Sequence, residues 1–109
     1  IYLSDHGENV YDEGDYSGHD YSDHIPNANV EIPFIMWFSH SQKEYLQSRN
    51  PLLAQQTHTP YMIDDLFHTI IDVADIATEV LDERRSFVNA SYDSTRVRHL
   101  EDGSIYTRL

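Results

Sequence analysis

The sequence predicts an α/β protein, in which helices pack against a sheet in layers. Three observations support this fold class. A short apolar run opens the chain, a second apolar run covers residues 34–38, and a helical apolar pattern covers residues 63–74. The order strand, loop, strand, helix is typical of an α/β layer arrangement.

The first strand is expected at residues 1–3, where Ile, Tyr and Leu are followed by Ser4 and Asp5. The next stretch, residues 7–29, is rich in Gly, Asn, Asp and Ser and shows no sustained period, which predicts a loop. Loops of this length are uncommon inside compact domains and are usually functional or disordered. The loop is therefore the first place to look for a site.

The second strand is expected at residues 34–38, which are continuously apolar and follow Pro33. Such a run is typical of a strand buried on both faces of a parallel sheet. In open α/β sheets, ligands bind beyond the carboxyl ends of the strands. Asp5 and His6 stand at that kind of position, directly after the first strand.

Two helices are expected after the second strand. Ser41 and Glu44 have the spacing of a capping box, which predicts a helix that begins at Ser41 and stops before Pro51. In a second helix, Thr59 is the expected cap and Pro60 suits the first turn. The predicted core face of this helix consists of Ile63, Leu66, Phe67, Ile70, Ile71 and Ala74.

The last part of the chain carries weaker signals. Beyond Asp82 the sequence is polar and irregular. Asp102 and Gly103 form a turn signal, after which we expect a last short strand.

The composition excludes several classes of function. The 109 residues carry a net charge of −12, which repels nucleic-acid phosphates and anionic lipid headgroups. We therefore expect neither nucleic-acid binding nor direct headgroup binding by this segment. The chain has no cysteine, so disulfides, thiolate zinc sites and a cysteine nucleophile are excluded.

The pair Asp5 and His6 is a candidate metal site. A carboxylate and a neutral imidazole are good ligands for Zn²⁺, and the end of a strand holds them more firmly than a free loop does. A third ligand could come from His19 or His24, and Gly7 would let the backbone pass close to an ion. Such a pair also fits an ordinary polar loop surface, and the residues alone leave both interpretations open.

Several segments resemble one enzyme family. The stretches "YLSDHGEN", "SGH" and "VEIPFIMWFS" resemble, in this order, the C-terminal part of the bacterial phosphoethanolamine transferases. These enzymes belong to the alkaline phosphatase and sulfatase superfamily. The later stretches "DDLFHTIIDVADI" and "RRSFVNASY" resemble the last helix and the polar tail segment of the same catalytic domain.

The resemblance implies an α/β/α sandwich of the alkaline phosphatase and sulfatase type. Residues 1–109 would be its C-terminal segment, with the upstream part of the domain and a membrane region outside this chain. It also implies zinc-dependent transfer of phosphoethanolamine from phosphatidylethanolamine to lipopolysaccharide, on its core or on lipid A. The enzyme would be anchored in the bacterial inner membrane and face the periplasm.

The resemblance also implies roles for individual residues. Asp5 and His6 match the zinc ligands of the family. His19 matches a loop histidine that helps to bind a second metal or the phosphoethanolamine group, and His24 is the fallback for that role. The threonine nucleophile of the family lies upstream, so we expect no catalytic nucleophile here and no turnover by residues 1–109 alone.

Two alternatives stay open. The first is a sulfatase or a phosphoglycerol transferase of the same superfamily, which would use the same Asp5–His6 pair as metal ligands. The second is a non-catalytic acidic interaction domain, for which zinc and the Asp5–His6 pair would be irrelevant.

Overall fold

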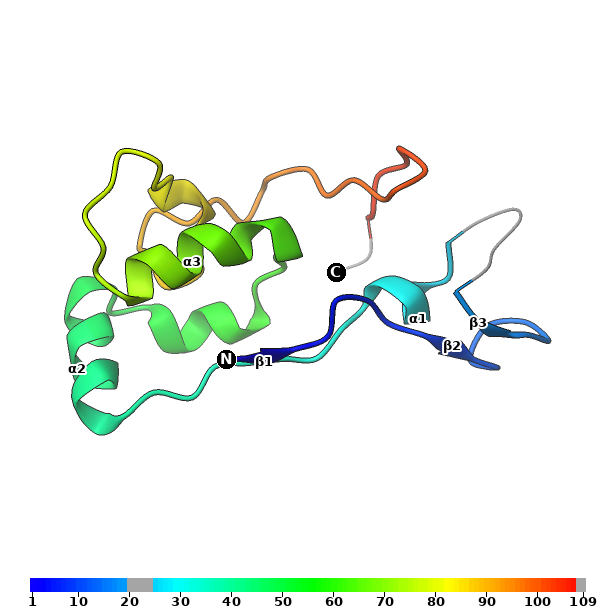
Figure 1. The fold of residues 1–109 in the computed structure, drawn as a ribbon, viewed down its shortest axis with the longest axis horizontal. Coiled ribbons are helices and arrows are strands. Elements are labelled where there is room, and N and C mark those ends of the chain that lie inside the picture. The colour runs from blue at the N-terminus through cyan, green and yellow to red at the C-terminus, as the bar shows by residue number, and fades with distance from the viewer. Residues whose placement is uncertain (20–24, 108–109) are drawn as a thin grey trace. The chain divides into compact units, whose positions relative to one another are not determined.

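A computed structural model of the chain describes residues 1–19 and 25–107. The described residues mix short helices with two small sheets (Figure 1). The chain divides into two compact units, Ile1–Trp37 and Phe38–Leu109, which are described separately below. Within the described ranges, no helix is both long enough and apolar enough to cross a membrane.

The first unit contains a pair of strands that brackets the predicted loop. Strand β1 (Tyr2–Leu3) pairs with β4 (Phe34–Ile35), and Tyr2 lies opposite Ile35. The pairing is antiparallel, so the expectation of a parallel sheet at these residues was wrong. Among the described residues this sheet has two strands, and exposure alternates along residues 34–38, with Ile35 at 58% and Trp37 at 81%. A continuous apolar run does not distinguish a central parallel strand from an antiparallel strand with one open face.

The predicted loop has structure of its own. It contains a hairpin of β2 (Asn9–Val10) and β3 (Ser17–Gly18), with Asn9 opposite Gly18, and a short helix α1 (Asn27–Val30). The strands are only two residues long, which is why they leave no visible alternation in the sequence. The hairpin turns where Tyr11 and Gly14 adopt positive φ angles of 62° and 79°.

The second unit begins with helix α2 (His40–Arg49). The expected helix is present, but its cap is Ser39 rather than Ser41: the Ser39 hydroxyl accepts a hydrogen bond from the Gln42 backbone N–H at 3.3 Å. The helix ends at Arg49 with Asn50 as its C-cap, so it stops before Pro51 as predicted. A 3₁₀ segment, η1 (Leu53–His58), follows it.

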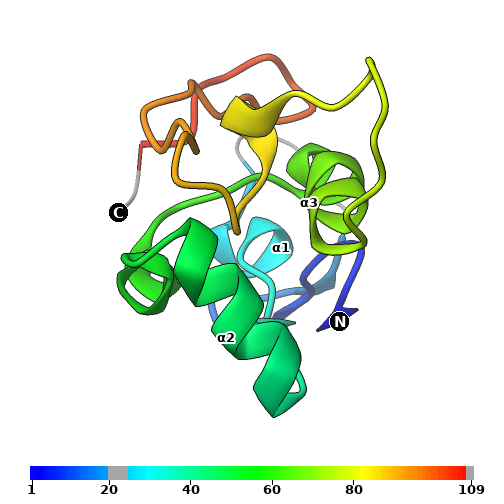
Figure 2. The ribbon, with the colours of Figure 1, turned by 90° about the vertical axis from the view of Figure 1, so that its left-hand side faces the viewer.

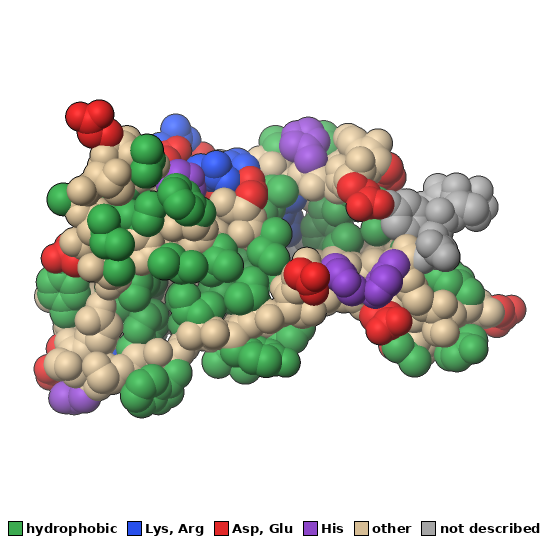
Figure 3. Space-filling model, in the orientation of Figure 1, with side chains coloured by type: hydrophobic (Ala, Val, Ile, Leu, Met, Phe, Trp, Pro, Cys, Tyr) green, Lys and Arg blue, Asp and Glu red, His purple; other side chains and the backbone are tan. Residues whose placement is uncertain are grey.

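The apolar helix is shorter than predicted, and its buried side differs. It consists of a 3₁₀ turn, η2 (Ile63–Asp65), and helix α3 (Leu66–Val73), so residues 60–62 are not helical and Thr59 does not cap it. Its buried residues are Asp65, Thr69, Ile71 and Asp72, whereas Ile63, Phe67 and Ile70 are 44–55% exposed. Figure 3 shows apolar side chains on the surface over α3.

The core of the second unit includes a segment that the sequence analysis described as irregular. Leu46 and Ile71 are buried together with Phe87 and Val88, which follow the 3₁₀ turn η3 (Glu83–Arg85). Figure 2 shows η3 beside α3. The segment is irregular in secondary structure but apolar at its centre, and short-range periodicity carries no signal for that arrangement.

The C-terminal turn was predicted correctly. Gly103 has a φ angle of +83°, and the Leu100 carbonyl accepts a hydrogen bond from its N–H at 3.0 Å. An antiparallel bridge joins His99 and Ile105 on either side of this turn.

Candidate functional site

The predicted Asp5–His6 pair lies in the bend that follows β1. Both side chains are exposed, Asp5 at 87% and His6 at 52%. The Asp5 Oδ1 atom accepts a hydrogen bond from the His6 backbone N–H at 3.1 Å, which fixes the carboxylate beside the imidazole. The end of the strand therefore presents one carboxylate and one ring side by side.

The hydrogen bonds of the His6 ring determine which nitrogen is available to a ligand. His6 Nδ1 lies 2.7 Å from the carbonyl oxygen of Gly7. Because a carbonyl can only accept, a neutral ring carries its hydrogen on Nδ1 and leaves the lone pair on Nε2. Metal-binding histidines commonly donate their other N–H to a backbone carbonyl in this way.

The free Nε2 atom faces an oxygen rather than a donor. It lies 3.7 Å from Asp5 Oδ1, which is too long for a hydrogen bond. A Zn²⁺ ion that binds both atoms at about 2.0 Å would hold them at most about 4 Å apart. The separation and the donor types of this pair therefore fit a shared cation.

The structure also brings His19 to His6. The two rings meet edge to face, with their centroids 4.0 Å apart. His19 follows β3, so the hairpin carries it back to the end of β1. Figure 3 shows two neighbouring histidine side chains on the surface over the segment that follows β1.

Each of these contacts joins two side chains, Asp5 with His6 and His6 with His19. In residues 1–19 and 25–107 there is no group of three or more His, Cys, Asp or Glu side chains that could hold a metal ion. Asp5, His6 and His19 thus supply ligand types suited to zinc without forming a complete site among themselves. His24, the alternative to His19, lies outside the described residues.

The backbone of Gly7 packs closely against helix α1. Its backbone N–H donates a hydrogen bond to the Asn29 carbonyl at 2.9 Å. A Cβ atom on Gly7 would lie 1.9 Å from the carbonyl oxygen of Ala28, well inside contact distance. Glycine is required here because the backbone of the site loop packs directly against helix α1.

A buried polar network supports the loop, and the sequence analysis missed it. Asn9 is fully buried, and its Nδ2 donates to the carbonyls of Glu13 and Tyr16 at 2.9 and 2.8 Å. The Glu13 carboxylate in turn accepts from the Asn27 backbone N–H at 2.8 Å. The signal in the sequence was the presence of Asn in a glycine-rich loop, since Asn side chains often bond to backbone in turns.

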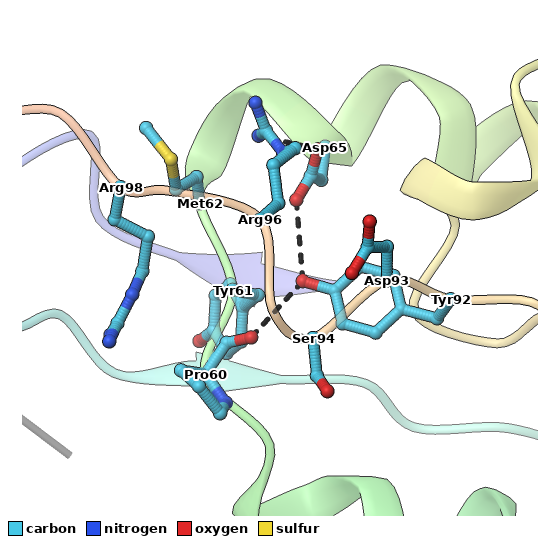
Figure 4. Close-up of a pocket in the computed structure, with 9 residues that line it drawn as sticks. All are labelled: Pro60, Tyr61, Met62, Asp65, Tyr92, Asp93, Ser94, Arg96 and Arg98. Carbon is cyan, nitrogen blue, oxygen red and sulfur yellow. Dashed lines mark hydrogen bonds and ion pairs between the residues drawn. The ribbon is translucent and has the colours of Figure 1, made fainter.

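The second unit buries a carboxylate among arginines. Asp65 is 1% exposed, and its Oδ1 accepts from Arg85 Nε at 2.9 Å and from Arg96 Nη2 at 2.8 Å. The Tyr92 hydroxyl lies between the Pro60 carbonyl and Asp65 Oδ2 (Figure 4). Burial raises the pKa of Tyr92 above its ordinary value, and the Asp65 carboxylate adds to this effect.

The pocket in Figure 4 lies beside this network and is lined by residues between positions 60 and 65 and between positions 92 and 98. Two of its charged groups, Asp65 and Arg96, bond to each other, and Asp93 pairs with Arg84. We interpret this cluster as structural, because its carboxylate and guanidinium groups already satisfy one another.

Comparisons with known proteins agree with the resemblance in the sequence. The family model described as Sulfatase matches residues 1–76. Phosphoethanolamine transferase EptC of Escherichia coli (strain K12) is 32% identical over 97 residues, which cover 87% of this chain. Phosphoethanolamine transferase CptA of Salmonella typhimurium is 30% identical over 97 residues, and phosphoethanolamine transferase EptA of Escherichia coli O157:H7 is 33% identical over 81 residues, 87% and 72% of this chain.

The match covers a small part of these relatives. The chain spans 16% of EptC and CptA and 15% of EptA. No solved structure matches the chain. The predicted similarity to phosphoethanolamine transferases is confirmed, and the chain belongs to the sulfatase family.

Proposed function

We propose that this chain is the C-terminal segment of a phosphoethanolamine transferase and supplies part of its zinc site. The similarity to EptC, CptA and EptA supports the reaction class. The observation that carries the metal site is the facing pair His6 Nε2 and Asp5 Oδ1, 3.7 Å apart. Two acceptor atoms turned toward each other without a hydrogen between them are suited to a cation.

Asp5 and His6 would hold the zinc ion, and His19 would bind a second metal or the phosphoethanolamine group. His24 is the alternative for the role of His19. A bound zinc ion would neutralise charge on the phosphoryl oxygens and lower the pKa of a hydroxyl nucleophile. The protein residues contribute fixed ligands, and we expect the threonine nucleophile to come from outside residues 1–109.

We further infer the setting of the reaction from the family. The donor would be phosphatidylethanolamine, and the acceptor would be lipopolysaccharide, on its core or on lipid A. The complete catalytic domain would be an α/β/α sandwich facing the periplasm, anchored in the inner membrane by a region outside this chain. The family match over residues 1–76 supports the superfamily on which this inference rests.

A second candidate is a sulfatase, because the matching family model carries that description. A sulfatase would use the same Asp5–His6 pair as metal ligands but needs a cysteine or serine nucleophile in place of threonine. Sulfate ester hydrolysis by the full-length protein, without phosphoethanolamine transfer, would favour this candidate.

The test uses the full-length protein with any sequence beyond residues 1–109. We expect His6→Ala to lose bound zinc and to reduce phosphoethanolamine transfer at least about 100-fold, since a metal ligand is removed. His40→Ala is the matched control, because His40 is an exposed histidine whose Nε2 lies 3.2 Å from Glu44. If Asp5→Ala and His6→Ala kept full zinc content and full transfer, the acidic interaction domain would be the better description.

A further inference from the structure

Asn29 connects both halves of the candidate site. It is 8% exposed and lies in helix α1. Its backbone carbonyl accepts a hydrogen bond from the Gly7 N–H at 2.9 Å, and its side-chain Oδ1 accepts one from the Asn9 N–H at 2.8 Å. Its Nδ2 donates to the carbonyl of His19 at 3.4 Å.

These three bonds reach the two segments that carry the imidazoles. Gly7 and Asn9 belong to the backbone directly after His6, and the third bond goes to His19 itself. The rings of His6 and His19 lie 4.0 Å apart, although His6 follows β1 and His19 follows β3. A single buried residue, through its backbone carbonyl and its side chain, therefore ties the two ring-bearing segments together.

We propose that Asn29 is a positioning residue that holds the segment of His19 against His6, so that the His19 imidazole lies beside a metal ion bound by Asp5 and His6. The inference rests on the proposed function, because it assumes a metal at Asp5 and His6. The edge-to-face contact of 4.0 Å keeps the His19 ring directly beside the ring of His6. Outer-shell groups of this kind orient metal-binding side chains.

The chemistry of the side chain explains why an amide is needed. Asn presents an acceptor and a donor at the same end of a short side chain. The acceptor is used by the Asn9 N–H and the donor by the His19 carbonyl. Aspartate keeps the acceptor and loses the donor, so Asn29→Asp retains the bond to Asn9 and removes the bond to His19.

The experiment is a Co²⁺ titration of the metal-free full-length protein, followed by the visible absorption of bound Co²⁺. Asn29→Asp, His19→Ala and the double variant form a mutant cycle with the wild type, and His6→Ala tests the metal site itself. Asn27→Asp is the matched control: it makes the same charge change in the same helix, and the bond of Asn27 to Glu13 uses its backbone N–H. Circular dichroism of each variant verifies folding, and if Asn29→Asp does not fold, Asn29→Ser takes its place in the cycle.

We expect Asn29→Asp to weaken Co²⁺ binding about tenfold, in the range typical of outer-shell changes. In the His19→Ala background the same change should weaken binding no further, because Asn29 acts through His19. Wild-type affinity in Asn29→Asp, or the same weakening in both backgrounds, would overturn the inference and leave the proposed function intact. Wild-type Co²⁺ binding by His6→Ala would instead overturn the proposed metal site, and the inference with it.

Discussion

The Oγ1 atom of Thr69 accepts a hydrogen bond from the Phe87 backbone N–H at 3.0 Å. The same hydroxyl donates to the Asp65 carbonyl at 3.0 Å, and Thr69 has no exposed surface. This one side chain therefore joins helix α3 to the buried segment after η3. The polar side of α3 is therefore the side that packs against the rest of this unit.

Thr69→Val is expected to destabilise the protein. The substitution keeps the shape of the side chain but removes the acceptor that the Thr69 hydroxyl offers to the buried Phe87 N–H, which costs about 1–3 kcal/mol. Urea unfolding followed by circular dichroism measures the change. Thr57→Val is the control, because the Thr57 hydroxyl makes a similar bond to the Ala54 carbonyl at an exposed position. A loss equal to that of the control would show that the bond to Phe87 is unimportant.

The sequence predicted the existence of α2, α3 and the Gly103 turn better than it predicted their surroundings. Caps and apolar spacing are local signals, so the helices were visible. The side of α3 that faces the interior could not be predicted from apolar spacing, because the apolar residues Phe67 and Ile70 are exposed while Thr69 and Asp72 are buried. Their burial depends on partners distant in the chain, and an apolar period cannot reveal such partners.

Asp65→Ala is expected to be more damaging than Asp64→Ala. Both carboxylates bond to Arg85 and Arg96, but Asp65 is buried whereas the Asp64 side chain is 48% exposed. Removing one partner from a buried ion pair costs about 3–5 kcal/mol, and we expect the lower end of that range because Asp64 remains. An exposed pair contributes about 1 kcal/mol or less. Equal midpoints of urea unfolding for the two variants would contradict this assignment.

Gly7→Ala is expected to disturb the site loop. The added Cβ would meet the Ala28 carbonyl oxygen at 1.9 Å, so β1 or α1 has to shift. Overpacking of this kind costs about 1–3 kcal/mol. The measurement is the midpoint of urea unfolding together with the zinc content of the full-length protein. Glu8→Ala, at the exposed neighbouring position, is the control and should leave both values unchanged.

The candidate site was also predictable only in part: its adjacent residues could be named from the sequence, and the residues that support them could not. Asp5 and His6 are adjacent and follow a recognisable strand, so they could be named from the sequence. His19 was named as a possible third ligand, with His24 as the alternative, but its ring contact with His6 was not predicted. Asn9 and Asn29, which support this arrangement, were missed because the bond between them joins positions 20 residues apart across an irregular loop. Side-chain to backbone bonds of this kind have no sequence period.

Asp72 is expected to make stability fall in acid. It is 2% exposed, and burial alone would raise its pKa. The nearby Ser86 hydroxyl and the bonds from Asn89 and Arg49 outweigh this effect and hold the pKa below its ordinary value of 3.8. Because the folded pKa is the lower one, the stabilisation is fully present above about pH 4 and is lost as the pH falls through the folded pKa.

Asp72→Asn should therefore lower stability at neutral pH and flatten its decline below about pH 4. Urea unfolding at a series of pH values between neutrality and about pH 2 measures both effects. Asp75→Asn, at an exposed position, controls for the loss of one negative charge. The pKa values of Asp93 and Asp102 are also lowered, by hydrogen bonds from Thr95 and from Ser104 respectively, so part of the acid dependence should remain. An unchanged slope in Asp72→Asn would mean that the Arg49–Asp72 pair does not contribute to the acid dependence.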